Sequence, residues 1–264
     1  MGTEPEVLTG RIHPTAIVAP GAKLARTVNV GPCSIIGENV EVGENTSIGA
    51  HNVIDGWTKI GARCRIFHST CIGVEPQDLK YAGEKTHVEI GDDNTIREFA
   101  TIHRGTDAKW VTRIGSHNLI MAYVHVAHDC VIGDHTIIAN AVNLAGHVTV
   151  EDYASIGGVT PVHQFARIGS HAYIGGGSRV PQDVPPYMLA AGNPIRIVGI
   201  NQVGLERRGF STDTRSALRK AYKLLYRSEK NVTQAVAAIR AELPDLPEIR
   251  YLLDFIESSE RGIT

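Results

Sequence analysis

The chain has 264 residues, which is enough for one sizeable domain and a small second one. Its 26 Lys and Arg residues nearly balance 28 Asp and Glu residues, which excludes a global basic field for nucleic acid or an anionic membrane. The four cysteines lack paired spacing, so they exclude a zinc finger or a disulfide framework and indicate a reducing compartment. The start, MGTEPEVLTGRIHP, lacks a basic and then apolar signal, and no apolar stretch reaches about 18 residues. We therefore expect a cytoplasmic protein without a transmembrane segment.

An aliphatic residue recurs at every sixth position through most of the chain. The series runs in phase from Ile12 to Ile72, resumes at Ile90 and again at Ile114, and continues to Val180. Glycine often follows the aliphatic residue, and we expect it to relieve backbone strain at bends. Because each repeat supplies one short strand and one turn, three repeats close a triangular coil of about 18 residues. The sequence predicts an all-β fold, a parallel β-helix over residues 1–190.

Two interruptions keep the phase of the repeat but lack its aliphatic residues. They lie at about 74–88 and 104–113, and we interpret them as loops that leave the coil. Residues 191–264 change to helical periodicity, which predicts a linker and a small α-helical C-terminal domain. Its helices are expected at 213–228, after an N-cap at Asn231, and from Pro247 to near Gly262.

Several polar residues of the uninterrupted repeat fall within a few phases of the coil. Residues three repeats apart should stack on adjacent coils about 4.8 Å apart, so Gly146 should lie directly beyond His128. One edge of the prism is therefore predicted to carry His125, His128, Gly146, His147, His163 and Gln164. Histidine accepts a proton near neutral pH, and an amide beside a glycine can approach an oxyanion closely. This pairing suits acyl transfer.

Two other interpretations compete with a catalytic edge. Outward polar residues on a solenoid can simply be solvated, which would make the protein a catalytically silent scaffold. Three imidazoles on neighbouring coils could instead bind zinc, as in a hydratase of the γ-carbonic anhydrase type. Taken alone, Asp78, Lys80, Arg207 and Arg208 also fit solvated segments, although an arginine pair suits a pyrophosphate.

Longer strings carry a family likeness that extends nearly from end to end. They are QDLKYAGE at 77–84, TIHRGT at 101–106, NLIMAYVHVAHDC at 118–130, LAGHV at 144–148, VHQF at 162–165, QDVPPY at 182–187 and RRGF at 207–210. With these strings the chain resembles the UDP-N-acetylglucosamine O-acyltransferases of lipid A biosynthesis. The resemblance implies a left-handed coil and a homotrimer, acyl carrier protein as the donor's carrier, UDP-N-acetylglucosamine as acceptor, and neither a metal nor another cofactor.

The same resemblance assigns catalytic roles to three residues. It implies that His128 is the general base, that Asp129 orients it, and that the Gly146 amide holds the oxyanion. Because adjacent residues of a strand point to opposite faces, we expect Asp129 to act on His128 through the backbone.

Substrate contacts follow from the resemblance as well. Those for the sugar and the acyl donor would come from Asp78, Lys80, His125, His147, His163 and Gln164. Those for the uridine diphosphate would come from Asn201, Arg207 and Arg208. His103 lies at another phase of the coil, so we expect it to reach the cleft only from a neighbouring subunit.

Three positions bear on specificity. Val203 stands where the family often has an acidic residue, so one nucleotide contact is expected to be missing or replaced. The second loop has few glycines and contains Trp110, which puts its donor contacts in question. Gly176 lies where acyl length is set, and a glycine there would permit a longer chain.

The nearest rival is the N-acyltransferase that acts later in the same pathway, and a UDP-sugar with a 3-amino acceptor also stays open. That enzyme has a separate N-terminal nucleotide-binding domain, for which we expect no room ahead of Ile12.

Overall fold

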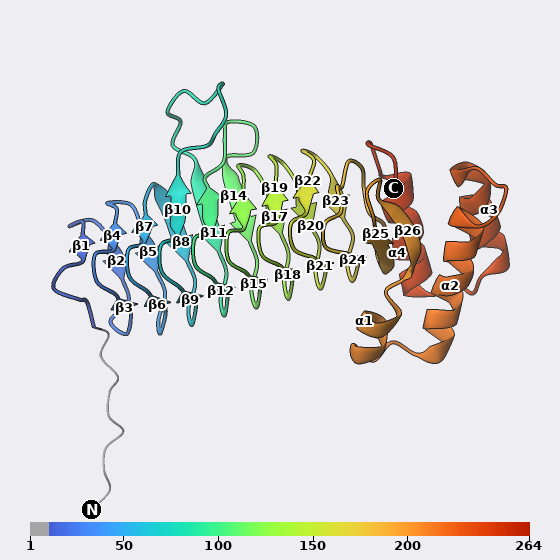
Figure 1. The fold of residues 1–264 in the computed structure, drawn as a ribbon, viewed down its shortest axis with the longest axis horizontal. Helices are drawn as coiled ribbons and strands as arrows, with labels where there is room; N and C mark the ends of the chain where they lie inside the picture. The colour runs from blue at the N-terminus through green and yellow to red at the C-terminus, as the bar shows by residue number, and fades with distance from the viewer. Residues whose placement is uncertain (1–10) are drawn as a thin grey trace, which may run out of the picture.

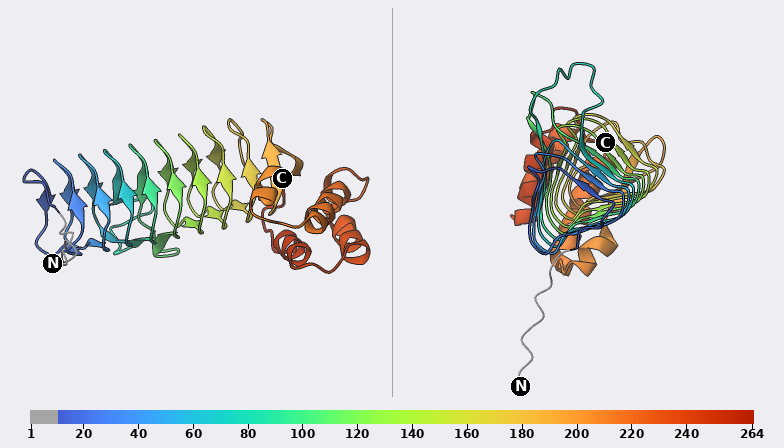
Figure 2. Two further views of the ribbon diagram at one scale, coloured as in Figure 1. Left: turned by 90° about the horizontal axis from the view of Figure 1, so that it is seen from below. Right: turned by 90° about the vertical axis from the view of Figure 1, so that its left-hand side faces the viewer.

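The computed structural model describes residues 11–264. Short parallel strands form three flat sheets that enclose a triangular prism, as Figures 1 and 2 show. The predicted left-handed parallel β-helix is thus confirmed over the described part of its range. Residues 1–10, with most of the N-terminal sequence discussed above, lie outside the described residues.

Each sheet takes one strand from every coil. Sheet 1 contains β1 (Ile17–Val18), β4 (Ile35–Ile36), β7 (Val53–Ile54), β10 (Cys71–Val74), β13 (Thr101–His103), β16 (His125–Val126), β19 (Asn143–Leu144) and β22 (Pro161–Val162). Sheet 2 contains β2 (Lys23–Leu24), β5 (Glu41–Val42), β8 (Trp57–Ile60), β11 (His87–Ile90), β14 (Val111–Ile114), β17 (Val131–Ile132), β20 (Thr149–Val150) and β23 (Arg167–Ile168). Sheet 3 contains β3 (Asn29–Val30), β6 (Ser47–Ile48), β9 (Arg65–Ile66), β12 (Thr95–Ile96), β15 (Leu119–Ile120), β18 (Ile137–Ile138), β21 (Ser155–Ile156), β24 (Tyr173–Ile174), β25 (Met188–Ala191) and β26 (Arg196–Ile200).

The six-residue series forms the core of the prism. Its members point inward at the second position of each short strand, and Ile54, Ile102 and Ile138 are fully buried. Small residues at the turns fill the corners, as at Cys130 and Ala154. Burial of each large aliphatic side chain contributes roughly 1.5–3 kcal/mol, so the repeat itself supplies most of the stabilisation.

The repeat glycines do not relieve strain at the bends, contrary to the prediction. The bends place non-glycine residues such as Asn45 (φ 58°) and His147 (φ 64°) in the left-handed region. Gly31 serves a different purpose, because a Cβ there would lie 2.6 Å from the carbonyl carbon of Gly49 on the next coil. These glycines allow the coils to approach closely.

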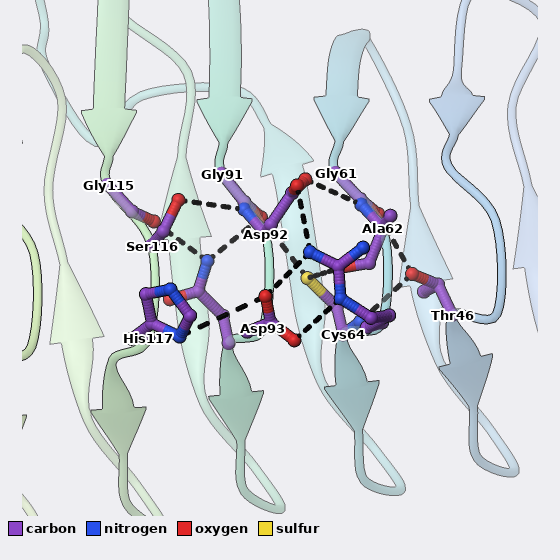
Figure 3. A network of polar contacts seen from close by, with 12 residues as sticks. Thr46, Gly61, Ala62, Cys64, Gly91, Asp92, Asp93, Gly115, Ser116 and His117 are labelled. Carbon is purple, nitrogen blue, oxygen red and sulfur yellow. Dashed lines mark hydrogen bonds and ion pairs between the residues drawn. The ribbon is translucent and has the colours of Figure 1, made fainter.

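Polar side chains connect neighbouring turns where sheets 2 and 3 meet, which we call edge 2/3. An Asp92 carboxylate oxygen accepts a hydrogen bond from the Ala62 amide (2.8 Å), and Ser116 Oγ accepts one from the Asp92 amide (3.0 Å). Arg63 pairs with Asp93 at 2.7 Å beside them. Figure 3 shows this network, which continues through Cys64 to Thr46 on the preceding coil.

Both loops leave the coil where sheets 1 and 2 meet, at edge 1/2. They occupy residues 75–86 and 104–110, slightly less than predicted, because Val88 and Thr112 are buried on four-residue strands. Figures 1 and 2 show the loops projecting side by side from one corner of the prism. Ile72 pairs with Ile102 and Ile102 with Val126, so both steps along the chain exceed that of a regular coil. The phase survives because each step remains a whole number of six-residue repeats.

The coil ends in a hairpin and four helices. β25 adds to sheet 3 in parallel and β26 in antiparallel, so the sheet extends to Ile200. The helices are α1 (Gln202–Arg207), α2 (Thr212–Tyr226), α3 (Val232–Glu242) and α4 (Pro247–Glu257). The last three were predicted, and Asn231 forms a capping box with Gln234. However, α4 ends at Glu257 rather than near Gly262, and the hairpin and α1 were not predicted. Within residues 11–264, no helix is long and apolar enough to span a membrane.

Candidate active site

His128 lies at edge 1/2, in the turn between β16 and β17. Its Nδ1 is 2.9 Å from Oδ2 of Asp129, which is fully buried. The expectation that Asp129 acts through the backbone is therefore wrong. The two residues belong to a turn rather than a strand, and the left-handed conformation of Asp129 (φ 59°) brings both side chains to the same side.

The Asp129 carboxylate is held by the second loop. Oδ1 accepts a hydrogen bond from the Thr106 amide (3.0 Å), and Oδ2 accepts one from the Thr106 hydroxyl (2.5 Å). Burial alone would raise the pKa of Asp129, but the hydrogen bonds from His128 and Thr106 lower it below its usual value. An ionised Asp129 places the proton of a neutral His128 on Nδ1, which leaves Nε2 free to accept another.

Gly146 lies against the His128 ring, one coil further on, as predicted. A Cβ at this position would lie 2.6 Å from Cε1 and 2.7 Å from Nε2 of His128. Within residues 11–264, the Gly146 amide donates no hydrogen bond to another backbone carbonyl. A free amide therefore lies beside the free nitrogen of a base, which is the arrangement needed to stabilise an oxyanion during proton transfer.

His147 forms a second wall of the site. Its ring centroid lies 5.1 Å from that of His128 in a T-shaped pair, and it stacks on Phe165 at 4.5 Å. Burial lowers the pKa of His147, although the Asp129 charge opposes this shift. The imidazole is therefore neutral near pH 7 and can donate or accept a hydrogen bond.

His125 and His103 lie side by side within one chain. Their ring centroids are 4.9 Å apart, and His125 Nδ1 is 2.7 Å from the Thr101 hydroxyl. The expectation that His103 could reach the cleft only from a neighbouring subunit is wrong. The second loop makes this coil longer than 18 residues, so β13 pairs with β16 and His103 comes to lie beside His125 in the same chain. Burial lowers the pKa of His103 to about 4.

The first loop brings Asp78 to the other side of the His128 ring. Asp78 Oδ2 lies 3.9 Å from His128 Nε2, so the two atoms could flank a small polar group. Lys80 is exposed on the same loop, and its amide donates to Asp78 Oδ1 (3.0 Å).

Three predicted residues lie further along the prism. His163 and Gln164 are exposed in the turn after β22, one coil beyond Gly146, where the Phe165 amide donates to the Gly146 carbonyl. Gly176 is exposed in the turn after β24, where sheets 3 and 1 meet, and a Cβ there would lie 3.1 Å from the Gly158 carbonyl oxygen. The role of Gly176 in chain length remains a prediction.

The predicted nucleotide contacts lie on a different side of the prism. The Arg208 guanidinium lies 4.4 Å from the Tyr153 ring centroid at edge 2/3. Arg207 and the exposed Val203 line a cavity of about 500 Å³ over sheet 3. Asn201 caps α1 and donates from Nδ2 to the His171 carbonyl (2.9 Å), so its side chain already has a structural function. Within one chain, these residues do not meet His128.

Comparisons with known proteins agree with this geometry. Family models match residues 183–264 (UDP N-acetylglucosamine O-acyltransferase, domain 2) and 112–146 (bacterial transferase hexapeptide). The acyl-[acyl-carrier-protein]–UDP-N-acetylglucosamine O-acyltransferase of Thermodesulfovibrio yellowstonii is 53% identical over 96% of this chain and 98% of its own, and that of Thiobacillus denitrificans is 54% identical over 96% and 98%. This chain belongs to the UDP-N-acetylglucosamine O-acyltransferase family.

Solved structures of family members have the same fold. LpxA of Acinetobacter baumannii matches with a TM-score of 0.93 and 47% identity over 96% of this chain and 99% of its own. LpxA of Bacteroides fragilis, a UDP-N-acetylglucosamine acyltransferase, matches with a TM-score of 0.95 and 44% identity over 96% and 100%.

Membership of this acyltransferase family decides against the silent scaffold and the zinc hydratase. His128, Asp129 and His147 do place ligand atoms within 4.8 Å of one another. However, both Asp129 oxygens already accept hydrogen bonds, and one of them orients His128.

The sequence analysis predicted no individual role for two residues near the site. Thr106 fixes Asp129, and the buried Arg104 contacts the first loop. Both lie in the TIHRGT string, but the six-residue pattern stops there, so no periodicity marked them.

Proposed function

We propose that this protein transfers an acyl or 3-hydroxyacyl group from acyl carrier protein to the 3-hydroxyl of UDP-N-acetylglucosamine. His128 acts as the general base. This would be the first step of lipid A biosynthesis. The observation that carries the proposal is the alignment of Asp129, His128 and the Gly146 amide on one edge. The names of the relatives, which are 53% and 54% identical, support the choice of donor and acceptor.

In the proposed mechanism, the sugar oxygen attacks the carbonyl carbon of the thioester while His128 Nε2 takes its proton. Asp129 stabilises the imidazolium through Nδ1, and the Gly146 amide donates to the oxyanion of the tetrahedral intermediate. The intermediate then collapses with cleavage of the C–S bond. The departing thiolate takes the proton from His128, which restores the neutral base.

Further side chains would position the substrates. Asp78 lies beside His128 on the first loop and Lys80 follows it there, and His125, His147, His163 and Gln164 lie along sheet 1 and its edge. The donor would arrive on the phosphopantetheine arm of acyl carrier protein, and the reaction would require neither a metal nor another cofactor. The cytoplasmic location remains a prediction from the sequence.

A homotrimer would complete the site. Arg207 faces a cavity over sheet 3, and Arg208 lies at edge 2/3, whereas His128 lies at edge 1/2. One copy cannot apply both regions to the same nucleotide sugar, because different sides of the prism carry them. Three flat-sided prisms around a threefold axis would bring one side of each copy against a different side of the next.

The test is an acyl-transfer assay with UDP-N-acetylglucosamine and a panel of acyl carrier protein thioesters. We expect wild-type turnover to survive EDTA and His128→Ala to reduce kcat by about 10²- to 10⁴-fold, as for a lost general base. The panel identifies the preferred chain and shows whether 3-hydroxylation is required. Wild-type inactivity with every donor, or full activity of His128→Ala, would refute the proposal.

A further inference from the structure

A three-residue segment at the start of the second loop contacts both loop 75–86 and the catalytic turn. This bracket segment consists of Arg104, Gly105 and Thr106, and all three residues are buried. It directly follows β13, so the rigid coil fixes one end of it. Its side chains reach in two directions from this anchored position.

Arg104 reaches into the first loop. Its guanidinium donates two hydrogen bonds to the Tyr81 hydroxyl, from Nε (3.0 Å) and Nη2 (2.7 Å). Nη1 donates to the Gly73 carbonyl (3.0 Å) at the end of β10. Tyr81 in turn donates to the Glu84 carbonyl (2.8 Å), so one arginine ties the middle of the loop to its base. Asp78 lies in the span that is closed in this way.

Thr106 reaches towards the catalytic turn. Its amide and hydroxyl bind the two oxygens of the Asp129 carboxylate and leave Oδ2 directed at His128. Gly105 makes this approach possible, because a Cβ there would lie 2.9 Å from Asp129 Oδ1 and 2.5 Å from the Val111 amide nitrogen. The segment is therefore packed directly against the carboxylate.

We propose that Arg104, Gly105 and Thr106 are positioning residues that set the two carboxylates flanking His128, with Asp129 at Nδ1 and Asp78 near Nε2. This inference deepens the proposed function and rests on His128 as the base. The proposal has two parts, one for Thr106 and one for Arg104. Thr106 controls the orientation of the base, and Arg104 controls the loop that would contact the acceptor.

Thr106→Val tests the first half, because valine keeps the shape and the amide but loses the hydroxyl. Loss of one charge-assisted hydrogen bond is expected to reduce kcat about 10-fold and leave the KM for UDP-N-acetylglucosamine within about twofold. With one donor fewer, the carboxylate is more basic, so the acidic limb of kcat/KM moves to higher pH. That limb reports the coupled His128 and Asp129 pair, which is faced by Asp78, His125 and His147.

Thr106→Ser restores the hydroxyl and should recover both kcat and the pH profile. Thr86→Val is the matched control, because Thr86 is also buried but its hydroxyl has no hydrogen-bond partner among the described residues. A Thr106→Val enzyme with wild-type kcat and an unmoved acidic limb would overturn the role of Thr106.

Arg104→Gln tests the second half. We expect the KM for UDP-N-acetylglucosamine to rise about 10-fold with a smaller change in kcat, because the substrate-contacting loop loses its anchor. Amide hydrogen exchange over residues 75–86 should be about 10-fold faster. Arg113→Gln is the control, because Arg113 is exposed on sheet 2 and pairs with Glu89.

The hydrogen-exchange measurement tests this inference independently of the proposed function. If the wild type acylates no UDP-N-acetylglucosamine, the proposed function fails, whereas exchange in the loop and at the Thr106 amide still decides whether the segment holds both regions. Unchanged exchange at 75–86 in Arg104→Gln would overturn the role of Arg104 even in an active enzyme.

Discussion

The buried Asp129 carboxylate binds Nδ1 of His128 although the two residues are neighbours in the chain. Such a contact is impossible between consecutive residues of a flat strand, whose side chains point to opposite faces. The left-handed turn at Asp129 makes it possible. Base and orienting group thus come from a single turn of the coil, and adjacent coils contribute the surrounding groups.

Asp129→Asn should separate charge from shape. An amide group at this position would present a donor or a weaker acceptor to Nδ1, so the tautomer with a free Nε2 would lose its support. We expect kcat to fall by about 10²- to 10⁴-fold, as when other histidine bases lose an aspartate partner. Asp93→Asn is the control, because Asp93 pairs with Arg63 at edge 2/3. Steady-state kinetics decides, and comparable effects of the two substitutions would contradict a specific role for Asp129.

Gly146→Ala should lower activity while the fold remains. The new methyl group would overlap the His128 ring, which must then move away from the reacting atoms. A displacement of this size should reduce kcat roughly 10²-fold. Gly199→Ala is the matched control, because no atom lies within 4 Å of a Cβ at that position. Steady-state kinetics measures the effect, and thermal unfolding checks that the variant is folded. Normal turnover by Gly146→Ala would contradict the proposed displacement of the His128 ring.

Mixing two inactive variants should restore activity. One carries His128→Ala and the other carries Arg207→Ala with Arg208→Ala, so each has one intact half of the proposed shared site. In trimers that contain both variants, about one site in three should be intact, because only one of the three interfaces joins an intact His128 to an intact arginine pair. Two differently tagged chains can be co-expressed and purified through both tags before the assay. A mixture of two edge 1/2 variants, His128→Ala and Asp129→Asn, should regain nothing. Activity no higher than that of this control would argue against sites shared between subunits.

The stability of the protein should fall as pH decreases from 7 to 5. Burial lowers the pKa of His171 to about 4, with a further contribution from Arg208. Between pH 6.5 and 4 the unfolded chain takes up a proton at His171 that the folded chain excludes, so His171 lowers the free energy of unfolding over this interval, by about 1 kcal/mol down to pH 5 after allowance for solvent screening. His171→Phe keeps the stacking on Tyr153 and should weaken the pH dependence in urea titrations. An identical pH slope in the variant would contradict this assignment.

The repeat was sufficient to predict the prism, because buried aliphatics at every sixth position allow few other structures. It also placed Gly146 against His128, since both lie in the uninterrupted region where all coils have the same length. His103 was misplaced because the step across the second loop, from Thr101 to His125, is one repeat longer than a regular coil. The size of that step depends on where the chain leaves and rejoins the sheets, which the pattern does not specify.

Other features do not follow from the aliphatic pattern. The αL conformation of Asp129 recurs at the same position of most repeats, as at Asn45 and His147, so it belongs to the turn of the coil and not to the residue type. The bonds made by Arg104 and Thr106 join segments whose separation is set by loop structure. Asn201, Arg207 and Arg208 were named from the family likeness, and only the structure shows that they lie on another side of the prism from His128.

The lengths of the two loops have a consequence for folding. Each coil closes a loop of chain against its neighbour, and the first interruption lengthens that loop by two repeats and the second by one. The entropy of closure grows only with the logarithm of length, so they cost about 0.5 and about 0.3 kcal/mol. The scaffold can therefore carry long functional loops at edge 1/2 with little loss of stability. Insertions or deletions confined to these two loops should be the length changes that it tolerates best, because they leave every aliphatic residue of the coil facing inward.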